Sequence, residues 1–260
     1  MFQWLTRRRR EPLLQTPLPA EWQAIIARNV PYVSRLPAAD HEELAGHIQV
    51  FLAEKKFEGC GGLDITDEIR VTIAAQACIL LLHSQTDYFS KLLSILVYPS
   101  TYVVPGGRHM GGGLVDDSPE ARLGESWVAG VVVLVWDSVL SGARDIHDGH
   151  NVVLHEFAHQ LDQEDGASDG LPILQHRSMY APWARVLGHD FDELVRDTNR
   201  HHRGVIDRYG ATDAAEFFAV VTEAFFEKPR QLRTKHAALY DELKKFYCQD
   251  PAELGDGKTA

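Results

Sequence analysis

The segment 155–159, His-Glu-Phe-Ala-His, constrains this chain more than any other, because it places two histidines four residues apart. On a helix, residues i and i+4 lie on the same face. Two imidazoles so placed can reach one Zn²⁺ at about 2.0–2.1 Å, and the glutamate beside the first can reach a water on the metal. The sequence therefore predicts a helix over about 150–163 with a hydrolytic zinc site, in which His155 and His159 are ligands and Glu156 is the general base.

The residues around this segment are apolar, which indicates that the helix is buried. The apolar positions are Val152, Val153, Leu154, Phe157, Ala158 and Leu161. Buried imidazoles and a buried carboxylate need polar partners, and a metal ion supplies one. The competing interpretation is a pair of histidines that are hydrogen-bonded within a helical core, without a metal.

A catalytic zinc site needs a third protein ligand, and its fourth position stays open to water. Glu216 is the first candidate, because its carboxylate stands in an apolar helical segment. The alternative is that Glu216 only occupies the first turn of its helix, where the dipole favours negative charge, with Asp213 as N-cap. Glu223, seven residues later, lies near the same face. It is open to three interpretations: a partner that holds a ligand from behind, an alternative ligand, or a solvated or ion-paired residue.

The second candidate for the third ligand is Asp165, six residues after His159. Another class of zinc peptidase places its third ligand there, after a sharp glycine turn. Asp162 occupies the turn position in this chain, and aspartate tolerates the left-handed backbone less well than glycine. Asp162 is more easily interpreted as a side chain that orients His155 or His159, or as a cap at the helix end.

Charge and cysteine content narrow the class of protein. The formal net charge is −11, which argues against nucleic acid as a direct partner, because phosphate binding needs clustered positive charge. The three cysteines, Cys60, Cys78 and Cys248, provide neither a disulfide framework nor a Cys-x-x-Cys metal pair. A reducing compartment is the simplest inference.

Neither a targeting segment nor a membrane span is expected. The arginines at 7–10 are not followed by the apolar run of a signal peptide. The most apolar stretches, 73–82 and 128–136, are too short to cross a bilayer. We therefore expect no membrane association and a cytoplasmic location.

The periodicity of apolar residues predicts helices, then strands, then helices. Helices are expected at about 20–28, 39–54, 67–82, 150–163, 182–200, 213–227 and 231–247, and two or three strands within 92–104 and 127–140, with glycine turns at 106–107 and 111–113 between them. Thr66 is the expected cap of the third helix. This order favours an α+β fold, with a flexible N-terminal arm over 1–20, a single domain over 21–249 and a C-terminal tail over 250–260.

Two blocks of the sequence resemble the Mlc titration factor A family of bacterial zinc peptidases. They are 148–162 (DGHNVVLHEFAHQLD) and 208–226 (RYGATDAAEFFAVVTEAFF), and the segments 135–138 and 141–145 also look familial. As a pattern, the resemblance extends over about residues 20–250. The second block is also similar to the catalytic domain of anthrax lethal factor, a gluzincin, around its tyrosine and zinc-binding glutamate.

The resemblance implies a mainly helical, zincin-like metallopeptidase domain with a small mixed β-sheet beside the helix that carries the two histidines. It implies one Zn²⁺ per chain, bound by His155, His159 and Glu216, with Glu156 as base. Tyr209 would face the substrate carbonyl and donate a hydrogen bond to the developing oxyanion; the alternative is an ordinary loop aromatic that covers the core. The implied activity is cleavage of short peptides, including aminopeptidase-like cleavage, and the implied partner is the glucose-responsive repressor Mlc, which would affect the regulation of sugar transport.

The main alternative is a non-catalytic regulatory protein that titrates a repressor, with zinc in a structural role. Structural zinc sites normally have four protein ligands, often cysteines. None of the three cysteines lies near either motif in the sequence. A purely structural zinc site is therefore the less favoured interpretation.

Overall fold

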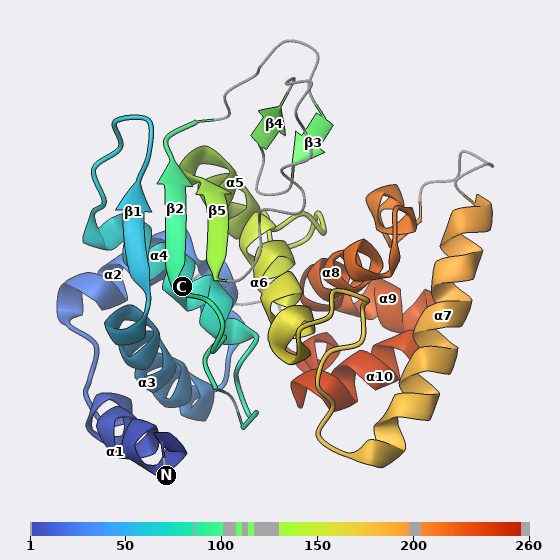
Figure 1. Ribbon diagram of the computed structural model, residues 1–260, viewed down its shortest axis with the longest axis horizontal. Coiled ribbons are helices and arrows are strands. Elements are labelled where there is room, and N and C mark those ends of the chain that lie inside the picture. Colours follow the sequence, from blue (N-terminus) through green and yellow to red (C-terminus); the bar gives the residue numbers. More distant parts are fainter. Residues whose placement is uncertain are drawn as a thin grey trace. The chain divides into compact units, whose positions relative to one another are not determined.

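The computed structural model, drawn in Figure 1, describes residues 2–85, 87–100, 108–110, 114–116, 130–197 and 204–255. Contacts between residues divide the chain into two compact units. The first comprises residues 1–144 and 255–260, and the second comprises residues 145–254. A single domain over 21–249 stays a prediction.

The first unit contains helices and a small parallel sheet. Its described elements, in which η denotes a 3-10 helix, are α1 (Phe2–Leu14), α2 (Ala20–Asn29), η1 (Pro31–Arg35), α3 (Ala38–Glu54), β1 (Lys56–Gly59), α4 (Asp67–Ile79), β2 (Ser94–Tyr98), β3 (Arg108–Met110), β4 (Leu114–Asp116), β5 (Val131–Val135) and α5 (Trp136–Arg144). Helices α2, α3 and α4 confirm three of the predicted helices. Thr66 caps α4 as expected, because its hydroxyl accepts a hydrogen bond from the Ile69 amide.

The sheet differs from the predicted mixed sheet. Its strand order is β1-β2-β5, and both pairings are parallel, as Figure 1 shows. Helix α4 stands between β1 and β2 in the chain, which is the crossover that two parallel neighbours require. Among the described residues, antiparallel pairing occurs only between β3 and β4, which form a separate two-stranded sheet. The mainly helical α+β class is confirmed.

The strand predicted within 127–140 is shorter than expected, because a helix takes over its second half. Strand β5 ends at Val135 and α5 begins at Trp136. Within α5, Val139 and Ala143 are buried four residues apart, which is helical spacing, not strand spacing. The glycine turns at 106–107 and 111–113 lie outside the described residues.

The N-terminal segment differs from the loose arm that its arginine-rich sequence predicts. Residues 2–14 form α1, and Arg10 is buried. Its guanidinium donates to Glu54 at 2.7 and 2.8 Å and to Asp87 Oδ1 at 2.8 Å. A buried arginine is tolerated when carboxylates pair with it, so these two partners anchor the helix.

The second unit is helical. Its described elements are α6 (Val152–Asp162), η3 (Gln163–Asp165), η4 (Arg177–Met179), α7 (Tyr180–Asp197), η6 (Arg208–Ala211), α8 (Ala214–Glu227), α9 (Pro229–Lys235), α10 (Ala237–Tyr247) and η7 (Pro251–Glu253). The helices predicted at 150–163, 182–200 and 213–227 are confirmed as α6, α7 and α8. The helix predicted over 231–247 is two helices, because the chain leaves helical geometry at His236, where φ is −132° and ψ is 57°.

Helix α8 is the centre of this unit. Every residue from Phe217 to Glu227 is buried, and the helix contacts α6, η6, α7, α9 and α10. A helix that is apolar all round belongs in a core. The three carboxylates of this helix, Glu216, Glu223 and Glu227, therefore depend on protein partners or a cation.

The predicted C-terminal tail is partly structured. Pro251 and Ala252 are buried within η7, and the Ala252 amide donates to the Tyr240 hydroxyl at 3.0 Å. Residues 256–260 lie outside the described part of the chain. Among the described residues, no helix combines the length and the apolar character that a membrane crossing requires.

Candidate active site

Helices α6 and α8 carry the residues that the sequence assigned to a metal. Each helix begins at a side chain that caps its amide groups. Asn151 Oδ1 accepts from the amides of residues 153 and 154 at 3.1 Å, and Asp213 Oδ1 accepts from the Glu216 amide at 2.9 Å. These caps satisfy amides that the helix itself leaves free. They also fix where along each helix the functional side chains project.

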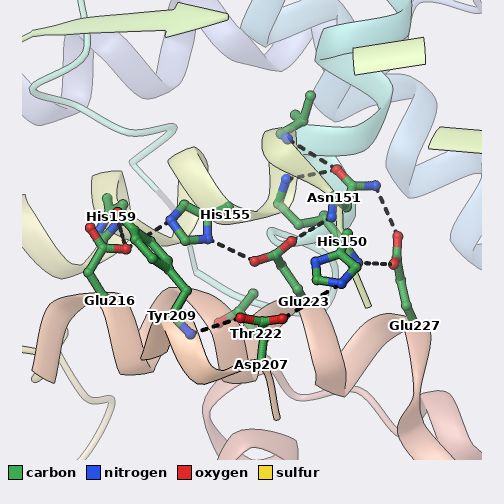
Figure 2. Close-up of polar contacts among 12 residues, drawn as sticks. His150, Asn151, His155, His159, Asp207, Tyr209, Glu216, Thr222, Glu223 and Glu227 are labelled. Atoms are coloured by element: carbon green, nitrogen blue, oxygen red, sulfur yellow. Dashed lines mark hydrogen bonds and ion pairs between the residues drawn. The ribbon is translucent and has the colours of Figure 1, made fainter. Parts of the chain in front are cut away.

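His155, His159 and Glu216 converge on one point, as Figure 2 shows. Glu216 Oε2 lies 3.0 Å from His155 Nε2 and 3.4 Å from His159 Nε2, and the three ligand atoms all lie within 4.8 Å of one another. A tetrahedral zinc ion with bonds of 2.0–2.1 Å separates its ligand atoms by about 3.3 Å. The distances from Glu216 to the two histidines therefore fit a metal ion of this kind.

One further group of histidine and carboxylate side chains occurs among the described residues, in the first unit. His83 Nε2 lies 3.3 Å from Asp40 Oδ2, and His83 Nδ1 lies 3.2 Å from Glu43 Oε2. The two carboxylates face different nitrogens of one ring. An ion on either nitrogen would leave the other carboxylate as a hydrogen-bond partner, so this cluster is better described as an ion-pair network.

Glu223 contacts the ring nitrogen of His155 that faces away from Glu216. Its Oε1 lies 2.7 Å from His155 Nδ1, and its Oε2 accepts a hydrogen bond from the Asn151 amide. A carboxylate on Nδ1 makes that nitrogen the proton donor and leaves Nε2 for a metal. Of the three interpretations open for Glu223, this geometry favours the partner that orients a ligand.

The charges at the centre favour a cation between the three side chains. Burial by itself would lower the pKa of His155, but the hydrogen bonds to Glu216 and Glu223 outweigh it and raise this pKa to about 10. Burial would raise the pKa of Glu216, but the hydrogen bonds from His155 and His159 hold it well below its usual range. A proton on the imidazole here stands in for a bound metal cation.

Tyr209 lies at the same centre. Asp207 caps the short 3-10 helix η6 by accepting a hydrogen bond from the Tyr209 amide at 2.8 Å. The ring centroid of Tyr209 lies 6.0 Å from that of His155. Burial, followed by the charge of Glu216, raises the pKa of Tyr209 to about 12. The hydroxyl therefore keeps its proton near neutral pH and remains a hydrogen-bond donor.

Glu156 also lies near the cluster. Its negative charge contributes to the raised pKa of both His155 and Tyr209. It follows His155 directly on α6 and is half-buried. The structure thus brings His155, His159 and Glu216 together, with the Tyr209 ring near His155 and with Glu156 next to His155 on α6.

Comparison with known proteins identifies the family of this chain. A family model described as glucose-regulated metallo-peptidase M90 matches residues 3–248. The chain belongs to the M90 family. It is therefore a metallopeptidase, and His155, His159 and Glu216 on α6 and α8 form a group that could hold a metal ion.

Several relatives align over nearly the whole chain. An uncharacterized protein of Synechocystis is 42% identical over 249 residues, which cover 95% of this chain and 90% of that protein. Mlc titration factor A of Serratia proteamaculans is 32% identical over 237 residues, covering 89% and 88%. Mlc titration factor A of Yersinia pestis is 29% identical over 256 residues, covering 96% and 91%.

Two acidic residues considered for this M90 site lie elsewhere. Asp162 is fully buried and its Oδ2 accepts from the Gly170 amide at 3.0 Å, so it holds the loop after α6. Asp165 is exposed, and its Oδ1 accepts from the Ala167 amide at 2.8 Å. Among the described residues it is not part of the group around His155, which favours Glu216 as the third ligand.

Sequence reasoning missed Asn151 and Glu227. Asn151 is buried at the start of α6, and Glu227 is buried near the end of α8. A signal for both was present. Asparagine directly before an apolar helix is a common N-cap. Positions 216, 223 and 227 are spaced by seven and four residues, which places all three carboxylates along one face of α8.

Proposed function

We propose that this M90 metallopeptidase is a zinc-dependent peptidase with His155, His159 and Glu216 as the metal ligands. The convergence of the three side chains on one point supports this proposal. Two imidazoles and a carboxylate are a common ligand set of catalytic zinc, and the fourth position is left for water. The Nδ1 partner of His155 has the place expected of a carboxylate that orients a zinc ligand.

The chain's own residues supply the proton transfers of peptide hydrolysis. Bound zinc would lower the pKa of water toward about 7 and polarise the scissile carbonyl. Glu156 takes a proton from the water as its oxygen forms a bond to the carbonyl carbon. The same carboxyl group then donates this proton to the amine nitrogen as the carbon–nitrogen bond breaks. The Tyr209 hydroxyl donates a hydrogen bond to the carbonyl oxygen, which gains negative charge in the transition state.

Replacing Tyr209 by phenylalanine is expected to lower kcat by about 10²–10³-fold, which is the effect of removing one oxyanion donor. Zinc content should not change, because the phenol is not one of the proposed ligands. Steady-state kinetics and metal analysis of the purified variant check both expectations. An unchanged kcat would show that Tyr209 only covers the site.

We further propose that the substrates are short peptides with a free amino terminus, as the resemblance to the Mlc titration factor A family implies. The test uses amino-acid 4-nitroanilides with free and with acetylated amino groups. The free compounds should be hydrolysed, the acetylated ones should not, and 1,10-phenanthroline should abolish the activity until Zn²⁺ is restored. Equal hydrolysis of both sets would contradict aminopeptidase specificity, and activity that resists complete metal removal would contradict the zinc mechanism.

A second candidate function is the binding of a transcription repressor. The names of the Serratia and Yersinia relatives, Mlc titration factor A, favour it. We propose that the chain binds an Mlc-type repressor in the cytoplasm, which the free state of Cys60, Cys78 and Cys248 suits. Purified Mlc should be retained by the immobilised chain. Retention by the Glu156→Gln variant would show that repressor titration needs no catalysis, and no retention by either protein would exclude this function.

A further inference from the structure

Asn151 lies directly before α6 and forms hydrogen bonds with both α6 and α8. It is 5% exposed, and each of its polar groups has a partner. On the α6 side, its Oδ1 caps the amides of residues 153 and 154, and its carbonyl accepts from the His155 amide at 2.9 Å. On the α8 side, its amide donates to Glu223 Oε2 and its Nδ2 donates to Glu227 Oε1 at 3.2 Å. Figure 2 shows the contacts of Asn151 with Glu223 and Glu227.

Glu227 is the far anchor of this arrangement. It is 2% exposed, and its second oxygen accepts from the His150 amide at 3.1 Å. The same amide donates to Asp148 Oδ1 at 2.9 Å, which places a second carboxylate next to Glu227. Burial, with the charges of Asp148 and Glu223, raises the pKa of Glu227 to about 9. A carboxyl group that is neutral at pH 7 can stay buried with few partners.

The backbone amide and the side-chain Nδ2 of Asn151 therefore contact α8 at Glu223 and Glu227, which are one helical turn apart. The Oδ1 and the carbonyl oxygen of Asn151 accept hydrogen bonds from amides of α6. A hydrogen bond to one residue of a helix permits the helix to rotate or slide, whereas two bonds one turn apart resist both motions. His155 begins the next turn of α6 and Glu216 lies two turns earlier on α8. Their separation of 3.0 Å depends on how the two helices are aligned.

We propose that Asn151 is a positioning residue, which sets the alignment of α6 and α8 and thereby the spacing of the metal ligands through its simultaneous bonds to Glu223 and Glu227. This inference rests on the proposed zinc site. It assigns Glu227 the role of an anchor on α8, and it explains why a carboxyl group remote from the reacting atoms is kept in the core.

The first test compares Asn151→Ser with the wild type. Serine retains a side-chain oxygen that can cap α6 and a backbone amide that can donate to Glu223. It lacks the side-chain Nδ2 group that donates to Glu227. We expect the dissociation constant for Zn²⁺ to rise by about 10-fold, within the range seen when groups behind a ligand are removed. It is measured by chelator competition on the metal-free chain. Thr66→Ala is the matched control, because it removes the N-cap of α4 in the other unit and should leave zinc affinity unchanged.

The second test approaches the same bond from α8. Glu227→Leu should weaken Zn²⁺ binding at least as much, because it also removes the bond from the His150 amide. The double variant Asn151→Ser/Glu227→Leu should lose no more than Glu227→Leu alone, because the bond between Asn151 and Glu227 is already absent there. Glu227→Gln should bind Zn²⁺ more tightly than Glu227→Leu does, since its amide oxygen can still accept from Asn151 Nδ2, although its NH2 group cannot accept from the His150 amide. Circular dichroism establishes that each variant is folded.

The outcomes separate this inference from the function on which it rests. Zinc affinity equal to the wild type in folded Asn151→Ser or Glu227→Leu would overturn the positioning role while leaving the proposed function intact. Additive losses in the double variant would also overturn it, because they would show two independent effects. A wild-type chain that binds no zinc would overturn the proposed function and this inference with it.

Discussion

The Glu156→Gln variant is expected to lose peptide cleavage by about 10²–10⁴-fold, which is the range attributed to one general acid–base group. Glutamine has nearly the shape of glutamate, but at neutral pH it cannot accept a proton from water. Zinc content should remain at the wild-type value, because the proposed ligands, His155, His159 and Glu216, are retained. The loss should fall on kcat, since proton transfer belongs to the transition state and not to substrate binding.

The measurement combines kinetics with the zinc content of the same preparation. Glu193→Gln is the matched control, because it removes one negative charge from an exposed position on α7 in the same unit. We expect this control to retain wild-type activity. Cleavage that persists in Glu156→Gln with zinc bound would show that another group takes the proton, and the mechanism proposed above would be wrong.

The Glu216→Ala variant is expected to lose zinc. Alanine leaves two imidazoles as the only proposed protein ligands. We expect the affinity for Zn²⁺ to fall by more than about 100-fold, which exceeds the effect of removing a residue that only hydrogen-bonds to a ligand. Peptide cleavage should disappear with the metal. The metal-free structure of the site is also expected to change, because His155 and His159 would lose the carboxylate that both of them contact.

Asp165→Ala is the decisive comparison for this prediction, because Asp165 is the competing candidate on sequence grounds. Its side chain is exposed and caps a turn, so its removal should leave zinc content unchanged. Zinc per chain is measured after dialysis of both variants against metal-free buffer. Loss of zinc from Asp165→Ala alone would exchange the two assignments.

Much of the chemistry at this site is local and could be predicted. The i, i+4 spacing of His155 and His159 places both on one face of any helix that forms there. Asp213 and Thr66 act as caps because a cap depends only on the next three residues. Where local signals compete, prediction failed: strands were predicted within 127–140, and only the folded chain shows that β5 ends at Val135 and α5 begins at Trp136.

Arg10 and Asp162 show what local sequence leaves open. An arginine-rich N-terminus is ordinarily solvated, but Arg10 meets carboxylates 44 and 77 residues away. Asp162 is close to His155 and His159 in sequence, yet its carboxylate accepts a hydrogen bond from the Gly170 amide. For both residues, the hydrogen-bond partner lies in another segment, and the local sequence does not specify that this segment comes close.

The sequence by itself determined the helix that presents His155, Glu156 and His159. It indicated Glu216 by a carboxylate in an apolar helical segment, and Tyr209 by resemblance to a known family. Only the tertiary structure decided that Glu216, 61 residues from His155, meets both imidazoles, that Glu223 lies behind His155, and that Asn151 joins the two helices. The physical reason is that intrahelical spacing follows from backbone geometry alone, whereas the approach of α6 to α8 depends on how their buried faces pack.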